Sequence, residues 1–192
     1  MDKPNGFLTK HAEKAEHNQY WYSSHTISKI VEELVASSKR VACVSTPSIY
    51  FSLPRGSPVR TAAWLLDYDD QWAKEQHFFK YDFNAPEDLP QELRGAFDCV
   101  VIDPPFITRE VWAKYAEAAK LLLEPEGKVI ATTVAENAGM LAELLPPGPG
   151  GFTLRPTPFR PSIPHLIYQY NLFTNFPPAV LCETNPEIPP DD

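Results

Sequence analysis

Asp103, Pro104, Pro105 and Phe106 are the residues whose types and spacing most directly suggest chemistry. They follow an apolar strand pattern at residues 97–102 and precede a helical pattern, which predicts a loop at the carboxyl end of a strand. Open α/β sheets bind ligands at that edge. The two prolines stiffen the loop and remove two N–H donors, so its carbonyls are free to accept hydrogen bonds. A carboxylate, rigid carbonyls and a flat ring suit the holding of a nitrogen with its lone pair aimed at an electrophile.

This loop needs a sheet to position it, and alternating strand and helix patterns predict one. An opening helix is predicted by five apolar residues at helical spacing. They are Ile27, Ile30, Val31, Leu34 and Val35. Strand patterns occur at residues 41–46, 63–67, 77–82, 97–102 and 128–133, and helical patterns at residues 108–123 and 134–145. This alternation predicts an α/β fold with a mostly parallel sheet.

The last strands follow a different pattern. Residues 152–155 and 165–173 flank a proline-rich loop, residues 156–164. Two strand patterns joined by such a loop predict a C-terminal antiparallel hairpin.

Residues 103–106 resemble the Asp/Asn-Pro-Pro-Phe/Tyr signature of S-adenosylmethionine-dependent methyltransferases that modify amino groups of adenine, cytosine, glutamine or lysine. Four further segments resemble, in order, one branch of these enzymes, the lysine methyltransferases of translation elongation factor 1-alpha, which were earlier described as N6-adenine-specific DNA methyltransferases. The segments are residues 19–23 (QYWYS), 42–50 (ACVSTPSIY), 68–69 (YD) and 81–84 (YDFN). The resemblance covers residues 17–174. It implies a Rossmann-like class I methyltransferase with a seven-stranded-type sheet and S-adenosylmethionine as its cofactor.

Two segments of the implied cofactor site each allow a purely structural alternative. Ser45, Thr46 and Pro47 stand where most methyltransferases have a glycine-rich turn, and no glycine is present. The alternative interpretation is a proline-led turn capped by hydroxyl groups. Tyr20 and Trp21 match a segment that lies beside the methionine end of the cofactor, although the two rings could equally pack over the sheet edge.

Two aspartates complete the implied cofactor site. Asp69 matches the family's Tyr-Asp pair at the end of the second strand, where a carboxylate accepts hydrogen bonds from ribose hydroxyls. Its neighbours Asp67 and Asp70 are expected to be solvated, and a surface role for all three is the alternative. Asp82 resembles the group that contacts the adenine amino nitrogen, with an Asx cap of the following turn as the alternative.

Composition predicts one domain with looser ends. We expect a flexible N-terminal arm at residues 1–16, the methyltransferase domain at residues 17–176, and a disordered tail rich in proline and acid at residues 177–192. The length of 192 residues is within the usual range for a single domain.

Charge and cysteine content narrow the function. The net charge of −8 disfavours a long phosphate footprint and suits a basic protein substrate, so nucleic acid is possible as a partner but not favoured. No apolar run is long enough to span a bilayer, and we expect a soluble, cytoplasmic protein without membrane contact. The three cysteines and the histidines lack ligand-like spacing, so no metal site is predicted. Cys43 and Cys99 are expected to be core residues.

The resemblance implies a protein-lysine N-methyltransferase whose substrate is elongation factor 1-alpha, and we expect it to be a monomer. Burial among aromatic rings would lower the lysine pKa from about 10.4, while Asp103 and the carbonyl of Pro104 would orient the amine. The motif does not separate lysine from adenine, but the chain has little room for the target-recognition region that duplex base flipping requires. N6-adenine methylation of RNA or DNA, and a non-catalytic Rossmann-like binding protein, are the alternatives.

Overall fold

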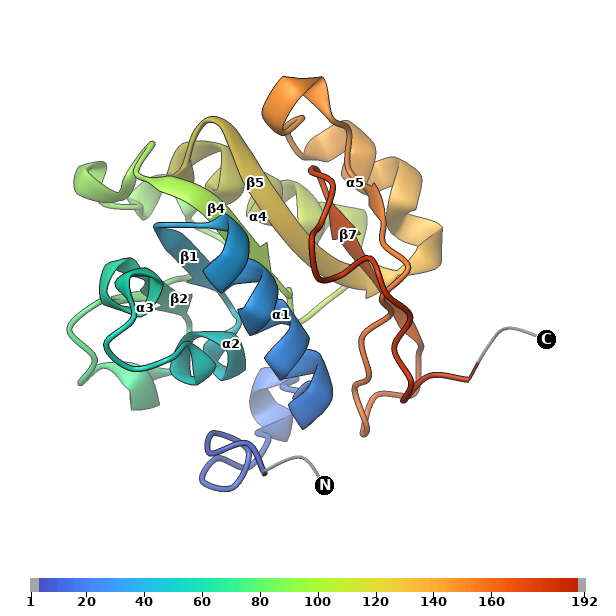
Figure 1. Ribbon diagram of the computed structural model, residues 1–192. Coiled ribbons are helices and arrows are strands. Elements are labelled where there is room, and N and C mark those ends of the chain that lie inside the picture. The colour runs from blue at the N-terminus through green and yellow to red at the C-terminus, as the bar shows by residue number, and fades with distance from the viewer. Residues whose placement is uncertain (1–3, 190–192) are drawn as a thin grey trace.

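The computed structural model describes residues 4–189, and a mixed seven-stranded sheet forms its centre (Figure 1). The strand order is β3-β2-β1-β4-β5-β7-β6. The strands are β1 (Val41–Val44), β2 (Trp64–Asp67), β3 (Phe78–Lys80), β4 (Phe97–Ile102), β5 (Leu123–Val134), β6 (Arg155–Pro156) and β7 (Tyr170–Thr174). Strands β1 to β5 are parallel, and β7 pairs antiparallel with both β5 and β6. The mostly parallel sheet and the C-terminal antiparallel hairpin are confirmed.

Helices cover both faces of the sheet. The α-helices are α1 (Ser24–Ser37), α2 (Pro47–Ser52), α3 (Pro58–Ala62), α4 (Arg109–Leu122) and α5 (Ala138–Leu144). Short 3-10 turns occur at η1 (Ala15–His17), η2 (Asp70–Trp72), η3 (Pro86–Asp88), η4 (Gln91–Leu93), η5 (Ala135–Asn137) and η6 (Pro149–Gly151). Figure 1 shows α1, α2 and α3 on one face and α4 and α5 on the other. Alternate residues of β1 accordingly belong to two separate hydrophobic clusters.

The sequence of α1 explains its position. Ser23 caps the helix, because its side chain accepts a hydrogen bond from the backbone N–H of Thr26. Four of the five predicted apolar residues are buried, but Val35 is 49% exposed. The residue that is buried instead is Glu33, which is fully enclosed. A carboxylate replaces an aliphatic side chain there because the C-terminal segment lies against this side of the helix.

Glu33 binds the C-terminal segment through backbone groups. Its carboxylate accepts hydrogen bonds from the N–H groups of Ala179, Val180 and Leu181, at 3.1, 2.6 and 3.1 Å. The side chain of Leu181 is fully buried. The red segment in Figure 1 runs alongside α1 for this reason.

The N-terminal segment is also packed. Phe7 is 5% exposed and belongs to an aromatic cluster with His11, Phe51 and Trp72, in which ring centroids lie 4.8 to 6.3 Å apart. The described parts of the predicted arm and tail therefore differ from the loose segments that composition suggested, because a few buried side chains and backbone acceptors hold them. Residues 1–3 and 190–192 of these predictions lie outside the described residues, and the domain boundaries at residues 17 and 176 stay a prediction.

Most predicted elements are present, with shifted ends. The predicted strand at residues 97–102 coincides with β4, and the helix predicted at residues 108–123 is α4. The first hairpin strand begins later than predicted, at Arg155, and the second at Tyr170. Helices α2 and α3 were not predicted, since each spans less than two full turns and leaves little periodicity to detect.

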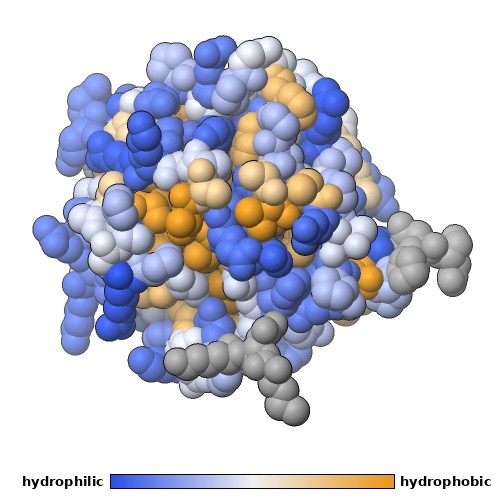
Figure 2. Space-filling model, in the orientation of Figure 1, coloured by the Kyte–Doolittle hydropathy of each residue, from blue (hydrophilic) through white to orange (hydrophobic). Residues whose placement is uncertain are grey.

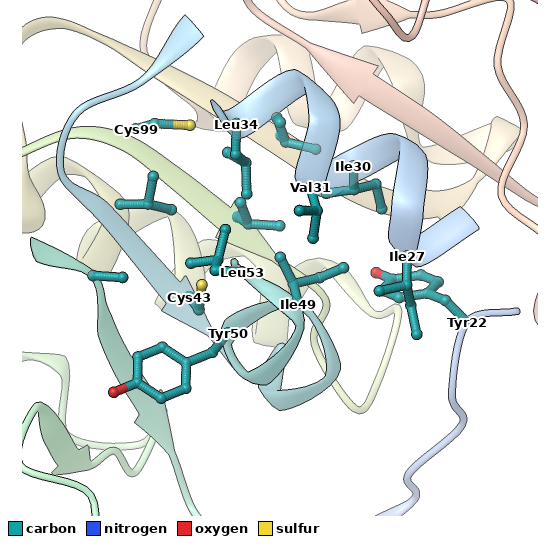
Figure 3. Packing of buried hydrophobic residues seen from close by; sticks show 14 of the residues in the cluster. Tyr22, Ile27, Ile30, Val31, Leu34, Cys43, Ile49, Tyr50, Leu53 and Cys99 are labelled. Carbon is teal, nitrogen blue, oxygen red and sulfur yellow. The ribbon is translucent and has the colours of Figure 1, made fainter. Parts of the chain in front are cut away.

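The core explains the two apolar cysteines. Cys43 and Cys99 are fully buried, which confirms them as core residues. Figure 3 shows the side chains of Ile27, Val31 and Leu34 directed from α1 toward the sheet that carries these cysteines.

The surface combines polar and apolar regions. Figure 2 shows hydrophilic residues around an apolar band across the middle of this face. In the described part of the chain, no helix has the length and apolar character needed to cross a membrane.

Candidate active site

One cavity lies where the carboxyl ends of β1, β2 and β4 meet, with a volume of about 290 Å³. All eleven predicted site residues line it. They are Tyr20, Trp21, Ser45, Thr46, Pro47, Asp69, Asp82, Asp103, Pro104, Pro105 and Phe106. The parallel register explains this convergence, because Val44 of β1 pairs with both Leu66 of β2 and Ile102 of β4, so the loops after these strands begin at the same edge.

Asp103 is held by two hydroxyl groups from other elements. Thr132 of β5 donates a hydrogen bond from Oγ1 to Asp103 Oδ1 at 2.9 Å. The hydroxyl of Tyr22 lies 2.6 Å from the same Thr132 oxygen. Because the threonine proton is directed to the carboxylate, the tyrosine must donate to threonine. Tyr22, Thr132 and Asp103 thus form a hydrogen-bonded chain that leads from buried hydroxyl groups to the partly buried Asp103.

Burial dominates the acidity of Asp103. Removal of the carboxylate from water raises its pKa to about 7, although the hydroxyl groups of Thr132 and Tyr22 act in the opposite direction. An ordinary aspartate is fully ionised at pH 7, whereas Asp103 exchanges its proton near neutrality. A carboxyl with this property can accept a proton as well as orient a donor.

In the rest of the 103–106 loop, one backbone carbonyl already has a hydrogen-bond donor from the protein itself. The side-chain amide of Asn18 donates to the carbonyl of Pro105, so that carbonyl is not free as the sequence suggested. Pro104 is buried, and the ring of Phe106 is 50% exposed at the edge of the cavity. The aromatic surface predicted for this loop is therefore available to a ligand.

The turn after β1 has the geometry of a glycine turn without a glycine. Ser45 has a φ of 56°, in the left-handed region that favours glycine. Its N–H donates to the carbonyl of Leu66 at 2.8 Å, and its hydroxyl lies 2.7 Å from the hydroxyl of Tyr115. These bonds offset the backbone strain of the turn. Thr46 and Pro47, both buried, then begin α2, with Pro47 in its first turn.

Asp69 is enclosed by the protein's own donors. Its carboxylate is 4% exposed, lies 2.9 Å from Lys14 Nζ, and accepts hydrogen bonds from Gln19 and Gln71. His17 Nδ1 lies 3.3 Å away without hydrogen-bond geometry. Burial raises the pKa of Asp69, but the hydrogen bonds from Lys14 and Gln71 outweigh it and lower the pKa to about 2. The predicted ribose acceptor is thus occupied by an internal ion pair.

Asp67 corrects another expectation from the sequence. It is the last residue of β2 and is 6% exposed rather than solvated. Burial raises its pKa to about 7, against the hydrogen bond that it accepts from the N–H of Asp69 at 2.8 Å. Asp70, in contrast, is exposed as expected.

The third strand ends in a turn beside the cavity. Asp82 is exposed and accepts hydrogen bonds from both nitrogens of Asn84, at 2.8 and 3.1 Å, which is the Asx-type arrangement named as its alternative. It lines the cavity at the same time. Its neighbour Tyr81 is 1% exposed, and the buried hydroxyl of Tyr81 has no partner within residues 4–189. Such a group in a cavity wall is available to a ligand.

Tyr20 and Trp21 both line the cavity, but only Trp21 also packs against the N-terminal segment. Tyr20 is 37% exposed at the cavity. The indole N–H of Trp21 donates to the carbonyl of His11, and its ring meets Phe7 edge to face at 5.1 Å. Trp21 therefore packs on the N-terminal segment while another part of it lines the cavity.

Sequence reasoning missed the partners of the predicted residues. Thr132 follows Ala131, which pairs with Ile102, so strand register places it beside Asp103. The adjacent hydroxyls of Thr132 and Thr133, directly after the apolar residues 129–131, were the available signal. Lys14 and Asn18 gave no signal, because contacts across tens of residues leave no periodicity, and Gln19 was noted only as part of the segment at residues 19–23.

Comparisons with known proteins agree with this geometry. Residues 13–178 match a family model described as "Probable N6-adenine methyltransferase". The chain belongs to this family. Among similar proteins, a zebrafish (Danio rerio) protein named EEF1A lysine methyltransferase 1 is 37% identical over 138 residues, or 66% of this chain and 82% of that protein. The human (Homo sapiens) protein of the same name is 35% identical over 133 residues, which cover 67% of this chain and 61% of the human protein.

A solved structure supports the fold of this methyltransferase family member. The precorrin 8W decarboxylase of Methanobacterium thermoautotrophicum superposes with a TM-score of 0.52 at 12% identity, and covers 90% of this chain and 98% of that protein. At this identity the similarity concerns the fold, which is the Rossmann-like arrangement expected from the sequence.

Proposed function

We propose that this family member is an S-adenosylmethionine-dependent protein-lysine N-methyltransferase that modifies elongation factor 1-alpha. The observation that carries the proposal is the charge of the cavity. Five acidic residues line it, of which Asp69 is already paired with Lys14, and none of the described lining residues is lysine or arginine. The five are Glu16, Asp67, Asp69, Asp82 and Asp103. A cationic lysine side chain is attracted to such a wall, whereas the phosphates of a nucleic acid are repelled. The names of the human and zebrafish relatives support the substrate.

The lining residues fit the proposed cofactor, which supplies an activated methyl group on a sulfonium when bound. The buried, unpartnered hydroxyl of Tyr81 and the buried carboxyl of Asp67 offer polar contacts inside the cavity. We assign the ribose hydroxyls to Asp67 rather than Asp69, because Asp69 is already engaged by Lys14. The other residues proposed to contact the cofactor are the turn at residues 45–47, Tyr20 and Asp82.

Asp103 then prepares the amine. A lysine ammonium has no lone pair, so it must lose a proton before it attacks a methyl group. The ammonium first binds the ionised carboxylate of Asp103. As the pair is enclosed, its two charges are disfavoured, and a proton moves from the lysine nitrogen to the carboxylate, whose pKa is raised to about 7. Phe106 provides the apolar wall that excludes water.

The substrate assignment is tested by competition between substrates. The purified protein is incubated with labelled S-adenosylmethionine and either unmethylated elongation factor 1-alpha or adenine-containing oligonucleotides, with Asp103→Ala as the control. We expect label on the protein that is lost in the variant. Label on the oligonucleotide alone contradicts the lysine assignment. If the purified protein binds no S-adenosylmethionine and labels neither substrate, catalysis is contradicted altogether.

The hydrogen-bonded chain to Asp103 predicts a change in pH dependence. Thr132→Val removes a bond that stabilises the ionised carboxylate, so the pKa of Asp103 rises further. Activity needs that carboxylate ionised, and its rise with pH is expected to move up by about one pH unit, with most activity recovered at pH 9. Thr132→Ser keeps the hydroxyl and is expected to keep the wild-type profile. A uniform loss at every pH in Thr132→Val would show that the residue only fills space.

The role of Asp69 is tested by a matched pair of variants. Lys14→Met and Asp69→Asn each break the ion pair that ties the segment at residues 13–19 to the cavity. We expect both to weaken S-adenosylmethionine binding by about fivefold, measured by calorimetry. Lys80→Met, which breaks the exposed pair with Asp70, serves as the control and is expected to leave binding unchanged. A much larger loss for Asp69→Asn than for Lys14→Met means that Asp69 contacts the cofactor directly.

We further propose that the protein acts as a monomer in the cytoplasm. The proposed substrate, a translation factor, supports this location.

A further inference from the structure

The loop between β6 and β7 exposes two apolar side chains next to the cavity. Ile167 is 93% exposed and Tyr168 is 63% exposed. Leu166, directly before them, lines the cavity, as does Tyr170 directly after the loop. Single exposed apolar side chains are common on protein surfaces. Two adjacent ones, flanked along the chain by residues that line a cavity, are unusual, because exposed apolar surface gains free energy when another molecule covers it.

The cavity lining includes three further exposed rings, one of which is Tyr68, with 57% of its surface exposed. Phe106 is 50% exposed and Tyr20 is 37% exposed, and both line the cavity. They come from the loop after β4 and from the segment before α1. Apolar groups from three separate parts of the chain therefore surround one opening, which is the composition typical of the centre of a protein interface.

The exposed tip stands on a fixed base. Ser162 accepts a hydrogen bond from the N–H of Ser23 at 2.8 Å and donates its own N–H to Thr26 Oγ1 at 2.9 Å. The side chain of Gln169 donates to the carbonyl of Pro161 at 3.0 Å. Anchored loops lose less conformational entropy on binding than free ones, so this geometry favours recognition.

We propose that Ile167 and Tyr168, with Phe106 and Tyr20, form the docking surface for the folded protein substrate, and that they contact apolar side chains beside its target lysine. This inference rests on the proposed function. The carboxylates inside the cavity attract the lysine itself, while the apolar mouth selects its neighbours. The partner is thus a protein surface on which a lysine lies among apolar residues, and specificity comes from surroundings that an isolated lysine lacks.

Steady-state kinetics with unmethylated elongation factor 1-alpha test the docking surface. The double variant Ile167→Ser/Tyr168→Ser is expected to raise KM for this substrate by about 10-fold to 100-fold. Its kcat at saturation, its affinity for S-adenosylmethionine and its melting temperature are expected to match wild type. Val35→Ser is the control, because Val35 is 49% exposed on α1 and does not line the cavity.

Other results overturn the inference. An unchanged KM in the double variant, or an equal rise in Val35→Ser, shows that the loop does not recognise the substrate. A loss of cofactor affinity or of melting temperature shows that the loop supports the cavity instead. Wild-type protein that labels no protein substrate overturns the proposed function together with this inference, whereas wild-type labelling with unchanged KM overturns this inference alone.

Discussion

Asp103→Asn is expected to lower kcat/KM for the protein lysine by about 100-fold or more. The substitution replaces only one carboxylate oxygen with an amide nitrogen. Asparagine can still accept a hydrogen bond, but it carries no charge to bind the ammonium and cannot take its proton. General acid-base contributions of this kind are worth about 100-fold to 10,000-fold. Measurement of kcat/KM between pH 6 and 9 checks the result. Wild-type activity is expected to rise with pH through about 7, the pKa of Asp103, and the variant is expected to lack that rise.

The same substitution is expected to stabilise the protein above neutral pH. Burial raises the pKa of Asp103 from its unfolded value of about 4 to about 7, so the folded state holds a proton that the unfolded state has lost. Stability therefore falls as pH rises from about 4 to about 7 and stays low above that. Asp103→Asn removes this penalty. At pH 8 the variant is expected to gain about 2 kcal/mol in its free energy of unfolding, so its melting temperature exceeds that of wild type by several degrees. Near pH 4 the two melting temperatures are expected to match.

Together the two measurements separate mechanism from structure. A less active but more stable variant at pH 8 is the behaviour of a residue whose burial serves catalysis. A variant that is less active and also less stable at pH 8 would contradict the assigned ionisation, because the loss of activity would then follow from unfolding.

Glu33→Gln is expected to lower the free energy of unfolding by about 2 to 4 kcal/mol, the largest stability loss we predict. The carboxylate of Glu33 is fully buried and accepts three backbone N–H groups from Ala179, Val180 and Leu181. Glutamine offers one acceptor oxygen and turns an N–H₂ group toward the remaining donors. Hydrogen bonds to charged groups contribute about 1.5 to 3 kcal/mol, and a buried donor left unpaired costs a similar amount.

Urea unfolding checks this value, with Glu32→Gln as the matched control. Glu32 is the preceding residue of α1, but it is 49% exposed and pairs with Lys29, so its loss is expected to cost less than about 0.5 kcal/mol. Hydrogen exchange of the three amides at residues 179–181 gives a local measurement. Equal effects of the two variants, or unchanged exchange in Glu33→Gln, would contradict the assigned role of Glu33.

The sequence predicted the sheet well because strands and their ends are local features. The apolar run at residues 97–102 and the Pro-Pro pair after it defined both a strand and the loop that follows. Pairing of parallel strands then brought that loop to the same edge as the turn after β1. For this reason the nine predicted site residues that follow strands β1 to β4 line one cavity, which Tyr20 and Trp21 reach from the segment before α1.

The missing parts are those set by long-range contacts. Asp69 is enclosed because Lys14, 55 residues away, reaches it, and Glu33 is buried because the segment at residues 179–181 lies against it. Helical periodicity predicted Val35 in the core, but burial depends on which segments cover each side of a helix. A polar residue such as Glu33 on a helix indicates that another segment covers it only when its hydrogen-bond partners are known.

Tandem mass spectrometry of elongation factor 1-alpha after incubation with this protein and S-adenosylmethionine tests the central claim most directly. We predict methyl groups on the side-chain nitrogen of one lysine with wild-type protein, and none above background with Asp103→Ala. Unmodified lysines in the presence of a correctly folded, cofactor-binding wild-type protein would contradict the assignment of the acidic cavity to lysine methylation.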